Sequence, residues 1–351
     1  MPRLRRADCS APGIRRRKAG KGFTYVDQNG NKVTDEATLE RIKALVIPPA
    51  WTDVWICPYP MGHIRAVGID QRGRKQYRYH DAWRQRRDAE KFDHMLEFAR
   101  ALPRIRQYAA EHLAEEGLTR NRVLACAVRL LDLGFFRIGT EGYAEENQTY
   151  GLATMRKSHV RIVGDEIVFD YIAKSGKRRI QSVADADVLD VVRELKARRS
   201  GGPELLAWRQ DDGAWVDVKS ADINAYIKEA TGGEFSAKDF RTWSATVLAA
   251  VALAVSSGVA RSESGRKRAI ARAMKEVSAY LGNTPAVCRS SYVDPRIIDR
   301  YTANATVLHA LASLDEDTGL GGLHTHGAIE EAVLDLLGDG PVEADEDVAA
   351  A

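Results

Sequence analysis

The sequence is poor in cysteine, with only Cys9, Cys57, Cys126 and Cys288 among 351 residues. None of the four lies in a C-x-x-C pair, so the sequence indicates neither a zinc site nor a disulfide framework. This scarcity is typical of a protein that works in a reducing cytoplasm. Long apolar runs are also absent: residues 247–255 are too few to cross a membrane and suit a buried helix. We therefore expect no membrane span and no metal centre.

Several catalytic signatures are missing as well. The chain has no G-x-x-x-x-G-K-[ST] phosphate loop, no H-E-x-x-H and no G-x-S-x-G. The sequence thus gives no support for ATP use or for a hydrolytic metal, and we expect no cofactor. Any chemistry must come from side chains alone, such as transfer of a phosphoryl group to a protein hydroxyl.

The charge of +3 hides a strong asymmetry along the chain. The first 300 residues carry 52 Lys/Arg against 38 Asp/Glu, whereas the remainder holds 11 Asp/Glu and no Lys/Arg. A body this basic predicts a polyanionic partner, although solvated surface charge is an alternative. Residues 1–22 hold eight Lys/Arg against one acid and predict a flexible basic arm. The acidic end either folds back on the basic body or serves as a solubilising tail.

The hydrophobic pattern predicts an α+β protein with two folded domains. Residues 20–85 show strand-like runs around Asn29-Gly30 and around Gly73, which favour two hairpins, with a short helix over residues 35–45. Helical spacing follows, notably over 120–133, 243–255 and 266–281, and again over 328–337. A three-stranded meander is predicted between residues 159 and 184. The expected segments are an arm (1–22), a β-rich domain (23–90), a mostly helical domain (91–310) and an acidic tail (311–351).

Four segments carry the residue types that phosphoryl transfer requires. They are GFFRIGTEGY (134–143), AKSGK (173–177), KDFRTWSAT (238–246) and LGNTPAVCRSSYVDP (281–295). The reaction needs a nucleophile, cations that stabilise the negative charge of the transition state, and an acid for the leaving oxygen. Arginine suits the cationic role because its fork meets two phosphate oxygens. Lysine suits the acid because a local field lowers its pKa.

The order and spacing of these segments resemble the catalytic segments of the poxvirus-like bacterial type IB topoisomerases. Residues 46–58 (VIPPAWTDVWICP) and 68–80 (GIDQRGRKQYRYH) are similar to the N-terminal domain of that family, so the resemblance covers about residues 20–305. It implies relaxation of supercoiled duplex DNA by transient single-strand cleavage through a 3′-phosphotyrosyl intermediate, without ATP or metal. It further implies a monomer that acts in the cytoplasm, associated with the nucleoid.

The resemblance also assigns roles to individual residues. Tyr292 resembles the nucleophile, and Arg137 and Arg241 resemble the two arginines that bind the scissile phosphate. Lys174 resembles the lysine that protonates the departing 5′-hydroxyl, with Lys177 as the competing lysine. The family often has histidine nine residues before the tyrosine, and Asn283 stands there in this chain.

Contacts to DNA are expected at two further places. Gln76, Tyr77 and Tyr79 match the part of the N-terminal domain that meets the major groove, although a half-buried aromatic strand face is the alternative. Tyr143 matches a tyrosine close to the scissile strand. Arg268 and Arg272, with Lys275, have the spacing of one helical stripe that faces phosphates or simply solvent.

Two other functions fit part of the pattern. A tyrosine recombinase uses the same nucleophile and cations, but usually has histidine three residues before the second arginine, where this chain has Lys238. A non-catalytic DNA-binding protein would explain the basic charge but not the joint presence of the tyrosine, the lysine and both arginines.

Overall fold

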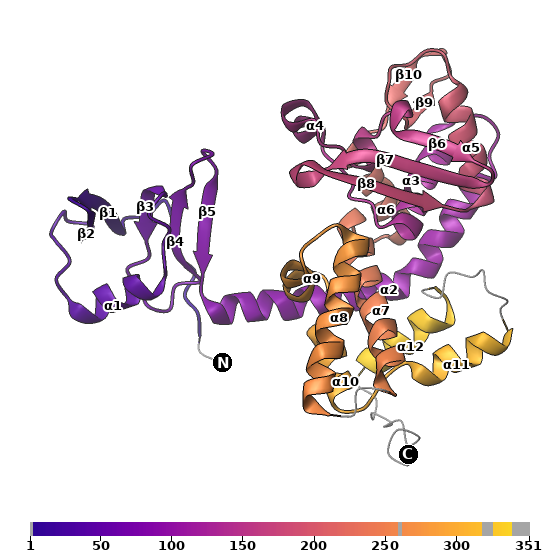
Figure 1. Cartoon of the computed structure of the whole chain (residues 1–351). Helices are drawn as coiled ribbons and strands as arrows, with labels where there is room; N and C mark the ends of the chain where they lie inside the picture. The colour runs from indigo at the N-terminus through magenta and orange to yellow at the C-terminus, as the bar shows by residue number, and fades with distance from the viewer. Residues whose placement is uncertain (1–2, 259–261, 318–325, 339–351) are drawn as a thin grey trace. The chain divides into compact units, whose positions relative to one another are not determined.

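The structure is a computed structural model that describes residues 3–258, 262–317 and 326–338. The chain divides into two compact units, Met1–Phe92 and Asp93–Ala351. The long helix α2 (Asp81–Leu113) crosses this boundary (Figure 1).

The N-terminal unit is built on one antiparallel five-stranded sheet in the order β2-β1-β3-β4-β5. Its elements are β1 (Ile14–Ala19), β2 (Gly22–Val26), α1 (Glu36–Ala44), β3 (Thr52–Ile56), β4 (Ile64–Ile69) and β5 (Lys75–Tyr79). Helix α1 begins at Asp35, whose carboxylate accepts a hydrogen bond from the Thr38 amide at 2.8 Å. Ile42 of this helix packs with buried residues of β1, β3 and β4. The expected short helix is therefore present and forms part of the core.

Residues 14–19, which the sequence assigned to a flexible arm, form the strand β1 instead. Ile14 is buried in the core, and the strand pairs with both β2 and β3. The segment before it is also held, because the Trp55 indole donates to the Ala11 carbonyl at 3.0 Å. The Arg16 guanidinium donates to the Trp51 carbonyl, so one basic side chain of β1 satisfies local acceptors. The prediction of a flexible arm rested on the count of charged residues, which does not reveal these backbone acceptors.

The two predicted hairpins have different outcomes. The β4–β5 hairpin around Gly73 is confirmed, and Asp70 accepts from the amides of Arg72 and Arg74 in its turn. The strand that precedes Asn29-Gly30 pairs instead with β1, through a turn at Gly20, whose φ is +55°. After Asn29-Gly30, only a single bridge between Val26 and Lys32 forms.

The C-terminal unit is mostly helical and contains the predicted three-stranded antiparallel meander, in the order β6-β7-β8. The class is therefore α+β, as expected. Its strands are β6 (Val160–Val163), β7 (Glu166–Ala173), β8 (Lys177–Val183), β9 (Ala207–Arg209) and β10 (Trp215–Asp217). The helices that follow α2 are first α3 (Arg120–Gly134), α4 (Glu141–Asn147), α5 (Ala186–Ala197), α6 (Ser220–Thr231) and α7 (Ala237–Ser257). They are followed by α8 (Glu263–Leu281), α9 (Pro285–Ser291), α10 (Pro295–Thr302), α11 (Leu308–Asp317) and α12 (Ala328–Leu337).

Helix α7 lies at the centre of this unit and contacts α3, α6, α8 and α10. It has the length and apolar composition of a membrane-spanning helix, but 67% of its most apolar window is buried inside the protein. Phe240, Trp243 and Leu253 are among its buried side chains. The helix thus belongs to the core and provides a rigid support for any polar residue it carries.

Part of the expected acidic tail belongs to the folded unit. Residues 328–337 form the predicted helix, α12, which buries Ile329, Val333 and Leu337 and contacts α7 and α10. These three side chains recur every fourth residue and so form one face of the helix. The apolar face of α12 therefore packs this segment into the folded unit despite its acidic composition, so residues 328–337 are not part of a separate tail. Residues 339–351 lie outside the described part of the chain.

Candidate active site

Arg137 lies in the loop that follows α3. The helix ends at Gly134, and Phe135 adopts a left-handed conformation with φ of +53°. That conformation costs roughly 1–2 kcal/mol for a residue with a side chain. Loop 137–138 is then fixed because the Arg137 carbonyl accepts from the Leu152 amide at 2.8 Å. The Arg137 guanidinium reaches across to donate to the Gly282 carbonyl at 3.2 Å.

Arg241 lies on α7, and its side chain is only 4% exposed. Its guanidinium donates to the carbonyls of Phe135 and Leu281, the latter at 2.8 Å. Its Nε is buried and has no hydrogen-bond partner among the described residues. Burial, together with the nearby charge of Arg137, lowers the pKa of Arg241 to about 10. The group therefore remains positively charged at neutral pH.

Asn283 follows Gly282, the left-handed residue that ends α8. The Asn283 side-chain oxygen accepts a hydrogen bond from Arg137. This bond fixes the amide orientation, because an arginine requires an acceptor. The amide nitrogen Nδ2 then lies buried with no hydrogen-bond partner in the described chain. The neighbouring Cys288 thiol interacts with Asn283 but is only a weak acceptor.

Tyr292 directly follows α9, and its backbone is held on both sides. The Tyr292 amide donates to the Cys288 carbonyl at 3.0 Å. Its carbonyl accepts from the buried hydroxyl of Thr246, a residue of α7, at 3.2 Å. The ring lies beside Arg241, whose guanidinium carbon is 5.5 Å from the ring centroid. Helix α7 thus positions the tyrosine and one arginine together.

The Tyr292 phenol has a pKa below the ordinary value for tyrosine. Burial raises the pKa, but the positive charges of Arg241 and Arg137, with hydrogen bonding to both, lower it by more. Since a nearby cation favours the phenolate, the site is chemically suited to making this oxygen nucleophilic.

Lys174 lies in the turn between β7 and β8. The turn is tight, with left-handed conformations at Ser175 and Gly176. Lys174 shares a pocket of about 290 Å³ with Arg137, Arg241 and Tyr292. Four of the five residues assigned to catalysis thus line one cavity, and Asn283 holds one of them.

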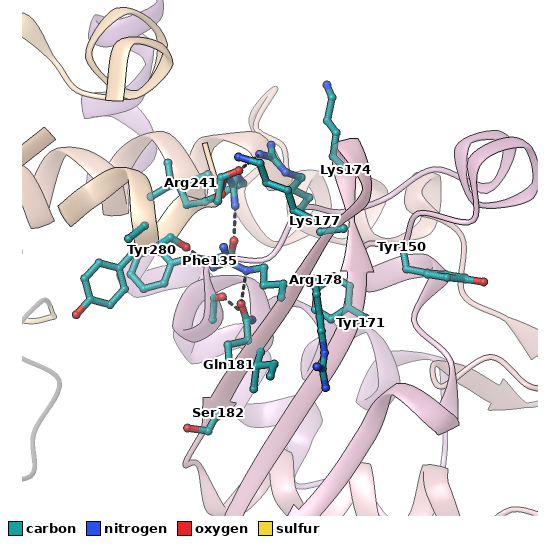
Figure 2. A pocket seen from close by; sticks show the side chains of 18 of the residues that line it. Phe135, Tyr150, Tyr171, Lys174, Lys177, Arg178, Gln181, Ser182, Arg241 and Tyr280 are labelled. Carbon is teal, nitrogen blue, oxygen red and sulfur yellow. Dashed lines mark hydrogen bonds between the residues drawn. The ribbon is translucent and has the colours of Figure 1, made fainter. Parts of the chain in front are cut away.

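A larger cavity of about 630 Å³ adjoins this pocket and shares Arg137, Lys174 and Arg241 with it (Figure 2). Its lining includes several further cations and no carboxylate; these cations are Lys177, Arg178 and Arg179. Figure 2 shows Lys174 extending from the tip of the β7–β8 hairpin, away from Arg241. Lys177 lines only this larger cavity and is absent from the pocket that holds Tyr292.

The residues expected to bind DNA in the N-terminal unit lie on β5. Tyr77 and Tyr79 are 40% and 38% exposed, and their rings stack with centroids 5.8 Å apart. Gln76 lies on the other face, where its amide donates to Asp70 at 2.9 Å. The two tyrosines are therefore available to a partner, whereas the Gln76 amide is held within the hairpin.

The other expected DNA contacts lie in the C-terminal unit. Arg268 and Arg272 are exposed on α8, on the face opposite its buried residues. Arg272 also donates to the Ser256 hydroxyl at 3.4 Å. Tyr143 lies on α4, but its side chain is outside the described part of the chain.

Three residues near the site had no assigned role in the sequence analysis. Thr246 donates to the Tyr292 carbonyl, Arg179 donates to the carbonyl of Tyr280 in the last turn of α8, and Tyr150 lines both cavities. Thr246 lies on α7 five residues after Arg241, in the segment already singled out. The other two stand in no recognisable pattern.

Two family profiles match this chain. The profile described as "Eukaryotic DNA topoisomerase I, catalytic core" matches residues 80–313, and "Bacterial DNA topoisomerase IB, N-terminal domain" matches residues 22–70. DNA topoisomerase 1B of Acanthamoeba polyphaga mimivirus is 33% identical over 299 residues, which cover 83% of this chain and 88% of the relative. DNA topoisomerase 1B of Vaccinia virus (strain Copenhagen) is 24% identical over 288 residues, covering 80% of this chain and 88% of the relative.

The electrostatics of Tyr292 can be tested by a titration that requires no substrate. The difference in ultraviolet absorbance between wild type and Tyr292→Phe, followed with pH, should reveal one tyrosine that ionises below its ordinary pKa. Arg137→Gln should move that ionisation to higher pH, because removal of a positive charge disfavours the phenolate. Lys177→Gln serves as the control and should leave it in place. An unchanged pKa in Arg137→Gln would contradict the field described above.

Proposed function

Because this chain belongs to the type IB DNA topoisomerase family, whose substrate is DNA, we propose that it relaxes supercoiled duplex DNA by transient cleavage of one strand. The observation that carries the mechanism is the Tyr292 phenol, which lies beside two arginines and whose pKa they lower. In the first step, the Tyr292 oxygen attacks a DNA phosphorus. A 3′-phosphotyrosyl ester forms as the bond to the 5′-oxygen breaks.

Arg137 and Arg241 stabilise the transition state. In the attack, negative charge increases on the two non-bridging oxygens of the phosphate. The two guanidiniums are held by neutral acceptors, so their charges are not cancelled by a carboxylate hydrogen bond among the described residues. Preorganised cations of this kind cost no reorganisation when the reaction proceeds.

Lys174 supplies the proton for the leaving group. The departing 5′-oxygen would be a poorly stabilised alkoxide without it, so a proton donor that reaches this oxygen should speed the cleavage. Lys174 is favoured over Lys177 because only Lys174 lines the pocket that contains Tyr292. Its place in a hairpin turn allows the side chain to move as the strand binds.

Religation is the reverse reaction. The 5′-hydroxyl attacks the phosphotyrosyl ester, Lys174 takes back the proton, and Tyr292 is released. One ester bond replaces another in each direction, so the reaction needs no ATP, and supercoil strain drives net relaxation. The chain's own cations perform the charge stabilisation, so we propose that no metal is required.

One protomer carries every group in this scheme, so we propose that the enzyme acts as a monomer. The exposed Tyr77 and Tyr79 of β5 are proposed to contact the duplex, and the basic body to track its phosphates.

The nucleophile is tested by replacement of its oxygen alone. Wild type should relax negatively supercoiled plasmid in EDTA without ATP and should leave a covalent protein–DNA adduct after denaturation. Tyr292→Phe should do neither, yet bind DNA with nearly unchanged affinity, because the phosphate contacts remain. Relaxation by Tyr292→Phe would refute the assignment of the nucleophile. A strict metal requirement in wild type would refute the metal-free scheme.

The role of Lys174 is tested with a leaving group that needs no acid. On a duplex with a mapped cleavage site, Lys174→Ala should cleave about 10²–10⁴-fold more slowly, the range usual for loss of a general acid. A 5′-bridging sulfur, which leaves readily as a thiolate, should restore most of that rate. Lys177→Ala is the matched control and should show neither the large loss nor the rescue. If Lys177→Ala behaves as described for Lys174→Ala, the two assignments must be exchanged.

Asn283 is proposed to act through both ends of its amide. Its oxygen holds Arg137, while its buried and unpartnered Nδ2 is available to donate to a non-bridging oxygen of the phosphate. A neutral donor gives a hydrogen bond about half as strong as a charged one. A histidine at this position would provide the stronger bond when protonated.

Three substitutions separate the two roles of Asn283. Asn283→Ala should lower the cleavage rate by roughly 10 to 10³-fold. Asn283→Asp keeps an acceptor for Arg137 but has no donor, so it should be no more active than Asn283→Ala. Asn283→His should retain activity, with a gain below about pH 6.5, where imidazole becomes protonated. Wild-type rates in Asn283→Ala, at unchanged DNA affinity, would exclude Asn283 from the site.

A further inference from the structure

A buried carboxylate on α12, Glu330, binds two side chains from other helices. Glu330 is only 8% exposed. One oxygen, Oε1, accepts from the Trp243 indole at 2.8 Å and from Arg106 at 3.0 Å. The other, Oε2, accepts from Arg106 at 2.6 Å and from the Gly327 amide at 3.2 Å. A carboxylate with this many donors is fixed in one orientation.

Arg106, on α2, continues the network to α3. Its Nε donates to Asp132 Oδ2 at 2.9 Å and its Nη2 to Asp132 Oδ1 at 3.0 Å. Asp132 is 5% exposed. Arg106 thus makes a two-bond contact with each of two buried carboxylates. Removal of the Glu330 carboxylate would leave Arg106 paired with Asp132, but with two of its N–H bonds and the Trp243 indole deprived of their acceptor in a poorly solvated place.

The residues that this network holds are close in sequence to the two arginines of the site. Trp243 is the second residue after Arg241 on α7. Asp132 is the fifth residue before Arg137, near the end of α3. Helix α12 is therefore linked both to the element that carries Arg241 and to the element that leads into Arg137. Figure 1 shows α12 beside α7, and the helix lies beyond residue 313, where the match to the catalytic-core profile ends.

We propose that Glu330 is a positioning residue: through Trp243 and Arg106 it sets α7 relative to α3 and so fixes the separation of Arg241 and Arg137. This inference rests on the proposed function, because the separation matters only if both arginines bind one phosphate. Two guanidiniums that share a tetrahedral phosphate tolerate little displacement. A misplacement of about 1 Å can cost about 10²-fold in rate.

Two small changes test the network. Trp243→Phe removes the indole donor and keeps an aromatic ring, and Glu330→Gln keeps the side-chain length but removes the charge. Single-turnover formation of the covalent adduct should slow about 10-fold in Trp243→Phe and at least as much in Glu330→Gln. DNA affinity should stay within about two-fold of wild type. The double variant should be slowed by less than the product of the two single effects, because both changes act on one hydrogen-bond network.

A matched control separates positioning from general stability. Tyr226→Phe removes another hydrogen bond of the same unit, between the buried Tyr226 on α6 and the half-buried His112 on α2, and should lower the melting temperature without slowing adduct formation. A 5′-bridging sulfur should not rescue Trp243→Phe, because the defect lies in phosphate binding and not in the leaving group. Wild-type rates in folded Trp243→Phe and Glu330→Gln would overturn the proposal. Absence of adduct in wild type would instead overturn the proposed function.

Discussion

The site depends on two guanidiniums that lie close together without a carboxylate to neutralise them. Among the described residues, the hydrogen bonds of Arg137 and Arg241 go to backbone carbonyls, to the Asn283 amide and to the Tyr292 phenol. Carbonyl oxygens orient an arginine without cancelling its charge, so a strong positive field remains in the pocket. Burial and the neighbouring charge of Arg137 lower the pKa of Arg241, because both disfavour its positive charge. The phosphodiester proposed as substrate would offset this positive charge, since it offers negative charge at the same place.

The fold supplies these carbonyls from chain segments that are far apart in sequence. The left-handed Phe135 directs its carbonyl toward Arg241, and the end of α8 offers the carbonyls of Leu281 and Gly282. Each arginine therefore joins two segments of the site. The same hydrogen bonds that hold the cations also hold the loop after α3 against the end of α8. Arg179 adds a further link, from β8 to the carbonyl of Tyr280. The site is consequently rigid where charge develops, whereas Lys174 lies in an exposed turn.

Local patterns in the sequence predicted the elements around the site but not the long-range contacts. The β6–β8 meander and the helix over residues 328–337 follow from period-two and helical spacing, and the structure contains both. The strand β1 was missed because its Arg-rich composition resembles that of a flexible arm. Its pairing with β2 and β3 depends on tertiary contacts that local composition does not reveal. Helix α12 was predicted as a helix, yet its role in the core was not. The partner of Glu330 is Arg106, 224 residues earlier, and no local pattern encodes such a separation.

The same field has opposite consequences before and after DNA binds. In the free protein, Arg241 and Arg137 lower the pKa of the Tyr292 phenol. In the proposed complex, the negative charge of a phosphodiester beside both arginines would oppose their effect on the phenol. In the proposed mechanism, a stable phenolate beside an intact phosphate is therefore disfavoured, and the phenolic proton passes to water as the oxygen approaches phosphorus. The arginines then stabilise the charge that the attack adds to the non-bridging oxygens. In this proposed scheme their main contribution falls on the transition state, which is where an interaction raises the rate.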